Sequence, residues 1–214
     1  MSASCPAPLL GYRLQAPLLL GFAGPAGCGK STAAALLASR VGWVRLSFAE
    51  PLRELLLALH PHWDQWRLGP GKDLCQADGG LSPRNQMRTA GDWVKGYEPG
   101  FFANIMRRQL GAQMEMGSHV VIDDVRFEGE ARLIRELGGS LVHVSRTDVH
   151  FRRDHNSEMG VEPGATDLFL RNWDGLRTLG GELDYLLDAA IQARAPERDL
   201  PMDAANTASL RAVN

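Results

Sequence analysis

Nine consecutive residues near the N-terminus combine several features that bind phosphate. The stretch 24–32 reads Gly-Pro-Ala-Gly-Cys-Gly-Lys-Ser-Thr, which has the spacing Gly, four residues, Gly-Lys-Ser. Its glycines allow backbone N–H groups to turn inward around an anion, which a Cβ would obstruct. A helix predicted to follow would add its unpaired N–H groups and partial positive charge. The residues expected to contact a bound nucleotide are Gly24, Gly27, Cys28, Gly29, Lys30, Ser31 and Thr32.

Two side chains in this stretch have predicted chemical roles. Lys30 is expected to reach the β- and γ-phosphates, and the Ser31 hydroxyl to hold Mg²⁺. The chain has three lysines among its 23 basic residues, and one of them stands where a compact ammonium is wanted. ATP and Mg²⁺ are therefore the expected cofactors. The alternative interpretation is a glycine-rich turn between a strand and a helix, without a ligand.

Two adjacent carboxylates close a later apolar run. Residues 118–122 form a short hydrophobic stretch, and Asp123 and Asp124 follow it directly. A carboxylate at this place could hold Mg²⁺ beside Ser31, directly or through water. Adjacent strand residues point to opposite faces, so we expect one of the two to serve, and favour Asp123. The alternative is a carboxylate that caps a helix or lies in a loop.

Arginines gather after the third and fourth predicted strands. Phosphoryl transfer builds negative charge on the transferred group, and guanidinium groups neutralise such charge. We expect catalytic roles of this kind for Arg126, Arg146, Arg152 and Arg153. For any one of them the alternative is a solvated surface arginine, because the chain is rich in arginine.

A second group of cations lies between the second and third predicted strands. Arg53, Arg84, Arg88 and Lys95 could bind a second anionic substrate opposite the phosphate loop. No Ser–His–Asp or Cys–His arrangement is apparent. None is needed if the acceptor is itself a phosphate, whose oxygen is already an anionic nucleophile. A lid would have to exclude water, which would otherwise compete as acceptor.

The predicted secondary structure that carries these residues alternates between strand and helix. Apolar runs predict strands at 17–23, 43–48, 118–124, 140–145 and 167–170. Helical patterns are predicted at 30–40, 50–59, 83–95, 100–115, 127–137 and 176–194. This alternation indicates an α/β fold: a three-layer P-loop NTPase sandwich with about five parallel strands and helices on both faces. Ligands of such sheets bind at the carboxyl ends of the strands, where the phosphate loop and the acidic pair both lie.

The predicted organisation is one domain with two additions. Residues 16–194 are expected to form the P-loop domain, with a helical acceptor-binding insertion at 50–115 and a lid at 146–165. Residues 1–15 are expected to form an N-terminal arm, and 195–214 a disordered tail. Within the insertion, Leu52, Leu55, Leu56 and Leu59 predict an apolar helix stripe. Trp63 and Trp66 are interpreted as local packing, with an aromatic platform for a nucleobase as the alternative.

Composition limits the kinds of partner. A net charge of −2 over 214 residues gives no basic field for nucleic acid, so the expected partners are small molecules. Cys5, Cys28 and Cys75 are odd in number and widely spaced, which suggests neither a disulfide framework nor a zinc site. That cysteine usage predicts a reducing, cytoplasmic location, and the first apolar run is too short to span a membrane. A monomer and a homodimer both remain open.

Several pieces of the chain, in order, resemble one kinase family. After the phosphate loop come the pieces at 47–52, 82–84, 91–93, 121–127, 155–158 and 172–175. Together they are similar to the deoxynucleoside monophosphate kinases of tailed bacteriophages. Asp-Asp-Val-Arg-Phe at 123–127 and His-Asn-Ser-Glu at 155–158 point to this family most specifically. A phage-encoded enzyme of this kind would work in the host cytoplasm.

The resemblance implies a reaction and roles for residues. It implies transfer of the ATP γ-phosphate to a deoxynucleoside monophosphate, with Lys30 and Ser31 serving ATP and Mg²⁺. Arg126 and the lid arginines would neutralise the transferred phosphate, and Arg84 would help to hold the acceptor. Alternatives are another small-molecule kinase, such as a dephospho-coenzyme A kinase, and a nucleotide-gated switch.

The chain departs from the family in the presumed acceptor pocket. The family pattern has Gln where Arg88 stands and an Arg near Lys95, and the piece at 91–93 is one residue short. The accepted nucleobase and the preference for deoxyribose or ribose are therefore open.

Overall fold

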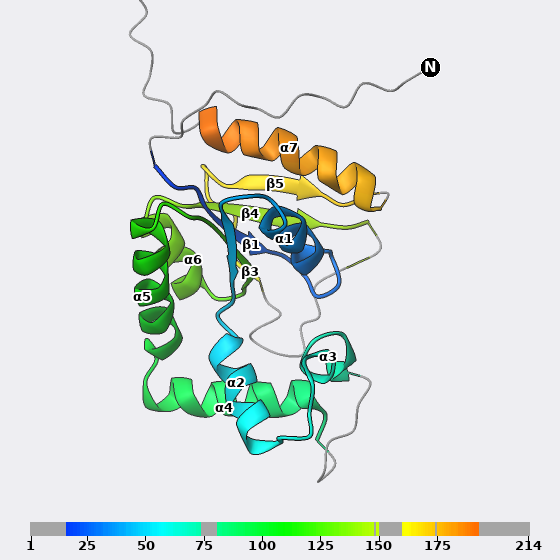
Figure 1. Cartoon of the computed structure of the whole chain (residues 1–214), viewed down its shortest axis with the longest axis vertical. Helices are drawn as coiled ribbons and strands as arrows, with labels where there is room; N and C mark the ends of the chain where they lie inside the picture. The colour runs from blue at the N-terminus through cyan, green and yellow to red at the C-terminus, as the bar shows by residue number, and fades with distance from the viewer. Residues whose placement is uncertain (1–15, 74–80, 148, 150–159, 174, 193–214) are drawn as a thin grey trace, which may run out of the picture.

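A computed structural model describes residues 16–73, 81–147, 149, 160–173 and 175–192. The predicted arm at 1–15 and tail at 195–214 lie outside these residues. The described part is built on five parallel strands in the order β2-β3-β1-β4-β5 (Figure 1). The strands are β1 (Leu19–Ala23), β2 (Trp43–Leu46), β3 (His119–Val125), β4 (Ser140–Ser145) and β5 (Leu168–Arg171). The predicted α/β fold with a five-stranded parallel sheet is confirmed.

Helices cover both faces of this sheet, because its central strands are apolar on both sides. On one face, α5 (Phe101–Glu115) and α6 (Glu128–Glu136) bury a core that includes Met106, Leu110 and Ile134. On the other face, α1 (Lys30–Ala38) and α7 (Leu176–Gln192) bury a second core that includes Leu37 and Leu183. None of the helices in the described ranges has the length and apolarity needed to cross a membrane.

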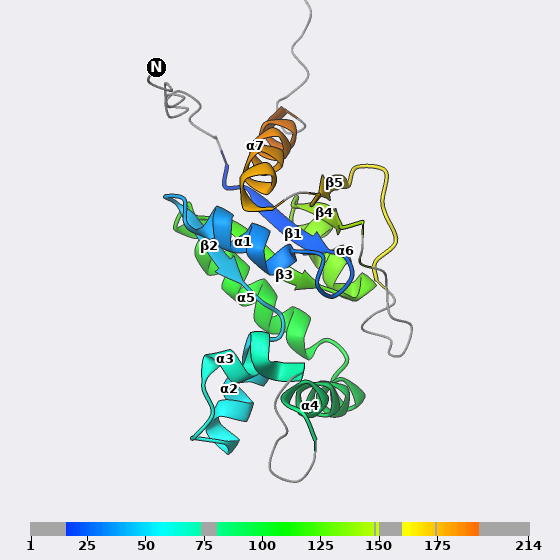
Figure 2. The ribbon, with the colours of Figure 1, turned by 90° about the vertical axis from the view of Figure 1, so that its right-hand side faces the viewer.

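The remaining helices project beyond the carboxyl edge of the sheet (Figure 2). They are α2 (Glu50–Leu59), α3 (Gln65–Leu68), the 3₁₀ helix η1 (Pro70–Asp73) and α4 (Pro83–Tyr97). N-cap side chains explain where two of these helices begin. The Asp64 side chain accepts from Arg67 N at the start of α3, and the Ser82 side chain accepts from Asn85 N at the start of α4. α3 and η1 lie between residues 60 and 82, where the sequence pattern predicts no helix, because four-residue helices are too short to show a periodic pattern.

The predicted leucine stripe of α2 is only half correct. Leu56 is buried and Leu52 is half-buried, but Leu55 and Leu59 are 41% and 63% exposed. The reason is that α2 packs mainly against one neighbour, α4, which covers a narrow strip rather than a full helix face.

The two tryptophans of the projecting part differ in burial. Trp63 is buried with Leu56 and Leu68 and stacks on His60, with ring centroids 4.0 Å apart. Trp66 is 51% exposed and lies against Gly71, where a Cβ would come within 2.4 Å of its ring.

Candidate active site

The phosphate loop connects β1 to α1 at the carboxyl edge of the sheet. Gly24, Gly27 and Gly29 have φ angles of +140°, +83° and +105°, which L-residues with a side chain rarely adopt. At Gly24 there is no room for a side chain either, because a Cβ would lie 2.3 Å from the carbonyl oxygen of Val144. The glycines of the motif are therefore required by the shape of the loop itself.

Lys30 begins α1 and folds back over its own loop. Its Nζ donates to the carbonyl oxygens of Gly24 and Pro25, both at 2.7 Å. Lys30, Ser31 and Thr32 line a cavity of about 830 Å³, a size typical of nucleotide-sized ligands. Asp123 and Asp124 line the same cavity from the end of β3. The two motifs, about 90 residues apart in the chain, thus meet at one edge of the sheet, as expected for parallel strands.

The two adjacent carboxylates have different surroundings. Asp124 accepts from Ser47 Oγ at 2.6 Å, from Phe48 N at 2.9 Å and from Ala49 N at 3.0 Å. It therefore holds the turn that leads into α2. Asp123 accepts from the guanidinium of Arg45 through Oδ2. Its other oxygen, Oδ1, is buried and has no hydrogen-bond partner among the described residues.

This unpartnered oxygen fits a bound Mg²⁺. Buried carboxylate oxygens are normally paired, and Asp123 is a residue of the cavity lining, so a cation bound there could be the partner of its Oδ1. Ser31 lines the same cavity. Within the described ranges no three carboxylate, His or Cys side chains cluster as metal ligands. Mg²⁺ in phosphate-transfer sites needs no such cluster, because it is held by one or two protein groups together with phosphates and water.

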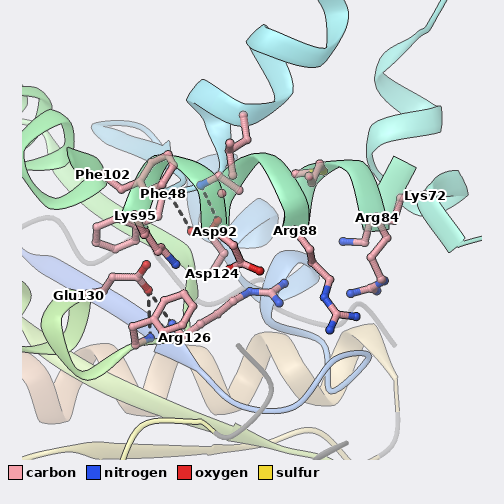
Figure 3. A pocket seen from close by; sticks show the side chains of 15 residues that line it. Phe48, Lys72, Arg84, Arg88, Asp92, Lys95, Phe102, Asp124, Arg126 and Glu130 are labelled. Atoms are coloured by element: carbon pink, nitrogen blue, oxygen red, sulfur yellow. Dashed lines mark hydrogen bonds between the residues drawn. The ribbon is translucent and has the colours of Figure 1, made fainter. Parts of the chain in front are cut away.

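A second, smaller cavity of about 100 Å³ adjoins the first. Three cations line both cavities and so stand at their junction: Lys72 from η1, Arg84 from α4 and Arg126 from the turn after β3. Arg88 lines the smaller cavity one helical turn beyond Arg84, and the side chains of Arg84, Arg88 and Arg126 converge in Figure 3. The junction therefore concentrates positive charge between the two cavities.

The far end of the smaller cavity is aromatic. Phe48, Phe102 and Phe127 line it together with Lys95. The Lys95 ammonium lies 3.3 Å from the centroid of the Phe127 ring and 5.8 Å from that of Phe102. Burial lowers the pKa of Lys95 from its ordinary value, although the charge of Glu130 acts against this. This end combines aromatic side chains with one cation, and that cation covers one face of the Phe127 ring.

Glu130 closes the same end and was not predicted as a site residue. Its Oε2 accepts from the backbone N–H groups of Arg126 at 2.8 Å and Phe127 at 3.2 Å. Burial raises the pKa of Glu130 to about 7, against the two backbone hydrogen bonds and with the charge of Asp124 adding to the rise. The sequence pattern predicts a helix at 127–137 but indicates no role for this carboxylate. A Glu at the third position of a helix is a capping signal, and it could have indicated that this side chain turns back.

Not every predicted residue lies at the cavities. Arg53 lines the larger one, but its guanidinium is paired with Glu50 at 2.6 Å. Gly24 and Cys28 shape the loop without lining either cavity, and Arg146 lines neither. Arg152 and Arg153 lie outside the described residues. Lys72 and Arg45 were missed, because a cation in an irregular stretch and one on a short edge strand give no sequence signal.

Comparison with known proteins assigns the family. A family model for deoxynucleotide monophosphate kinases matches residues 80–182. A protein of Acanthamoeba polyphaga mimivirus, provisionally named a deoxynucleotide monophosphate kinase, is 33% identical over 190 residues, covering 82% of this chain and 98% of that one. Among solved structures, a provisionally named kinase from Chloroflexus aurantiacus has a TM-score of 0.47 at 10% identity, covering 82% of this chain and 99% of that chain, which is too distant to add to the argument. By its sequence similarity to the viral protein, this chain belongs to the deoxynucleotide monophosphate kinase family.

Proposed function

We propose that the protein transfers the γ-phosphoryl group of ATP to a deoxynucleoside monophosphate, giving ADP and a deoxynucleoside diphosphate. The observation that carries this proposal is the junction of the two cavities. A phosphate loop opens into one cavity, an aromatic-ended pocket forms the other, and Lys72, Arg84 and Arg126 line both. A phosphoryl group passing between two bound nucleotides would have to cross this junction.

ATP would occupy the larger cavity with its phosphates at the loop. The backbone N–H groups of the loop and the Lys30 ammonium would bind the β- and γ-phosphates. Asp123 and the Ser31 hydroxyl would hold Mg²⁺. When bound, Mg²⁺ neutralises charge on the β- and γ-phosphate oxygens.

The acceptor would lie across the junction in one orientation, because the smaller cavity, at about 100 Å³, is too small for a whole nucleotide. Its phosphate group would lie at the junction, near Arg84 and Arg126, which line both cavities, and near Arg88, which lines the smaller one. Its base belongs at the opposite end, against the rings of Phe48, Phe102 and Phe127. This orientation directs the acceptor phosphate toward the phosphate loop.

The chemical step then needs positioning and charge neutralisation. A bond forms between an oxygen of the acceptor phosphate and the γ-phosphorus, while the bond from the γ-phosphorus to the β–γ bridging oxygen breaks. The leaving electron pair stays on ADP. The attacking oxygen is already anionic near neutral pH, so no side chain must remove a proton. Arg126 at the junction is the first candidate to neutralise the transferred group, and Arg146, Arg152 and Arg153 of the proposed lid are further candidates.

A coupled assay of ADP release tests this proposal. The wild-type enzyme is incubated with ATP, Mg²⁺ and one acceptor at a time: dAMP, dCMP, dGMP, dTMP, their ribose forms, or dephospho-coenzyme A. We expect ADP release that depends on at least one deoxynucleoside monophosphate. Activity on dephospho-coenzyme A alone would replace the proposed acceptor class. ADP release that no acceptor stimulates would favour a nucleotide-gated switch.

A further inference from the structure

Asn172 connects the far side of the sheet to the phosphate loop. It directly follows β5, and its backbone N–H donates to the carbonyl of Ser145 at the end of β4, at 2.9 Å. Its side-chain Nδ2 donates to the carbonyl oxygen of Cys28, also at 2.9 Å. The two residues of the second bond are 144 positions apart in the chain. A residue of the sheet edge thus holds one specific peptide group of the loop.

That peptide group joins Cys28 to Gly29. In a trans peptide the C=O and N–H groups point in opposite directions, and the described residues contain no cis peptide bond. With the Cys28 carbonyl directed at Asn172, the Gly29 N–H is directed away from it. Gly29 lines the larger cavity, and its N–H donates to no acceptor among the residues that the structure describes. It is therefore available to a ligand of that cavity.

Gly29 is the residue at which this peptide group could turn over. Its φ of +105° lies in a region that glycine enters at little cost, so the opposite orientation of the peptide is also accessible to it. In that orientation a carbonyl oxygen would replace the N–H, and it would repel a phosphate. Asn172 packs tightly here, since a Cβ on Gly29 would lie 2.4 Å from its Nδ2.

We propose that Asn172 is a positioning residue for the phosphate loop: its amide holds the Cys28 carbonyl outward and so keeps the Gly29 N–H directed at the phosphates of the bound nucleotide. This inference rests on the proposed function, because it assumes that the larger cavity binds ATP. It adds a role for a residue outside the loop motif. It also joins the phosphate loop to the end of β4, where the chain leaves for the proposed lid.

Nucleotide binding by two variants of the full chain provides the first test. Asn172→Asp keeps the size and removes both amide donors, and Asn172→Ala removes the side chain. Asn104→Asp and Asn104→Ala are matched controls, because Asn104 is exposed on α5 and its amide donates to Glu98. Loss of one hydrogen bond to a buried acceptor should weaken ADP binding about 10-fold by calorimetry. The KM for ATP should rise in parallel, and the KM for the acceptor should not change.

A single NMR signal provides the second test. Cys28–Gly29 is the one Cys-Gly pair in the sequence, so labelling with ¹³C-carbonyl cysteine and ¹⁵N-glycine leaves one HNCO signal, that of the Gly29 amide. We expect one sharp signal in the nucleotide-free wild type and in the Asn104 variants. In the Asn172 variants we expect this signal to shift and broaden, because the peptide is no longer held in one orientation.

The outcomes separate this inference from the proposed function. If the Asn172 variants keep the wild-type Gly29 signal and bind ADP as the controls do, the positioning role is wrong. If the variants lose thermal stability and raise the KM for ATP and the KM for the acceptor equally, the role of Asn172 is structural rather than positional. The inference is then also wrong. If the wild type itself binds no ADP, the proposed function fails, and with it the role of Asn172 toward phosphate.

Discussion

The two ends of the joined cavities are built in different ways. At the phosphate-loop end, nine consecutive residues supply the loop, and Lys30 is held by carbonyl oxygens of that same loop. At the aromatic end, the lining side chains come from the turn before α2, from α4, α5 and α6, and from the turn after β3. One end is local and formed largely by backbone. The other is distant in sequence and formed by side chains.

This difference indicates which part of the site can change in evolution without loss of the other part. A phosphate-binding loop formed by the backbone depends on glycine positions and tolerates few changes. Every nucleoside triphosphate also presents the same phosphate groups to it. A pocket of side chains from several elements can be altered one residue at a time. We therefore expect substrate preference to reside in the smaller cavity, which Lys95 lines at the aromatic end and Arg88 lines one helical turn beyond Arg84.

The largest effect should follow from Lys30→Ala. Removing the one ammonium of the loop takes away charge that the proposed reaction needs in its transition state, so kcat/KM should fall about 1000-fold. Circular dichroism and thermal unfolding should remain as in the wild type, because Lys30 lines a cavity and not a core. Arg40→Ala, which breaks a surface ion pair with Asp184, is the control. Equal activity of the two variants would mean that Lys30 of the phosphate loop takes no part in the reaction.

A second prediction separates the two adjacent carboxylates. Asp123→Asn should raise the Mg²⁺ concentration needed for half-maximal activity and lower kcat about 100-fold, because one proposed ligand loses its charge. Asp124→Ala should instead cost about 1–3 kcal/mol of folding stability, because three donors around Ser47–Ala49 lose their acceptor. Mg²⁺ titrations and urea unfolding measure the two effects. If Asp124, and not Asp123, controls the Mg²⁺ requirement, the proposed metal role belongs to the other carboxylate.

A third prediction concerns the cations of the acceptor end. Arg84→Ala and Arg88→Ala should each raise the KM for the deoxynucleoside monophosphate about 10-fold to 100-fold, since each removes a charged hydrogen-bond donor. The KM for ATP should stay within about threefold of the wild type. Arg107→Ala, at an exposed pair with Glu136, is the control. A rise in the KM for ATP alone would mean that these cations serve the donor end, and would contradict the assigned orientation.

The smallest effect is a pH dependence that belongs to the aromatic end. The pKa of Glu130 is raised to about 7 from an ordinary value of 4.5, so folding favours its protonated form. Ionisation of this buried carboxyl therefore costs no folding stability below pH 4.5, and it lowers the free energy of unfolding progressively between pH 4.5 and 7. Glu130→Gln can still accept from both backbone N–H groups. As the pH rises through that window, the free energy of unfolding of this variant should come to exceed that of the wild type by about 1–3 kcal/mol, measured by urea unfolding.

Asp167 is a matched control of opposite sign. Burial alone would raise its pKa, but hydrogen bonds from Arg135, from Gly164 N–H and from His143 outweigh burial and hold the pKa below its ordinary value. Its stabilising contribution is present above that ordinary value and is lost as the pH falls through the lowered one. Asp167→Asn should therefore be less stable than the wild type at neutral pH, and the deficit should shrink only in acid. If Glu130→Gln follows the same course, the raised pKa of Glu130 is wrong.

Much of the fold was predictable because its signals are local. Apolar runs of strand length alternate with helical patterns, and this alternation predicts a parallel sheet with helices on both faces. The leucines of α2 show the limit of such reasoning. An apolar stripe predicts burial, but whether Leu55 and Leu59 are covered depends on how much of the α2 surface the neighbouring helix contacts.

The phosphate loop, and the edge of the sheet at which it meets the acidic pair, could be predicted without coordinates, because both follow from residue spacing and from parallel strand order. The packing of the elements in space made Asp124 the support of a turn and left Asp123 Oδ1 without a hydrogen-bond partner among the described residues. It also brought Glu130 and Lys72 to the cavities and Asn172 to the loop. These are contacts between side chains far apart in the chain, and such contacts depend on the packing of whole elements rather than on any local pattern.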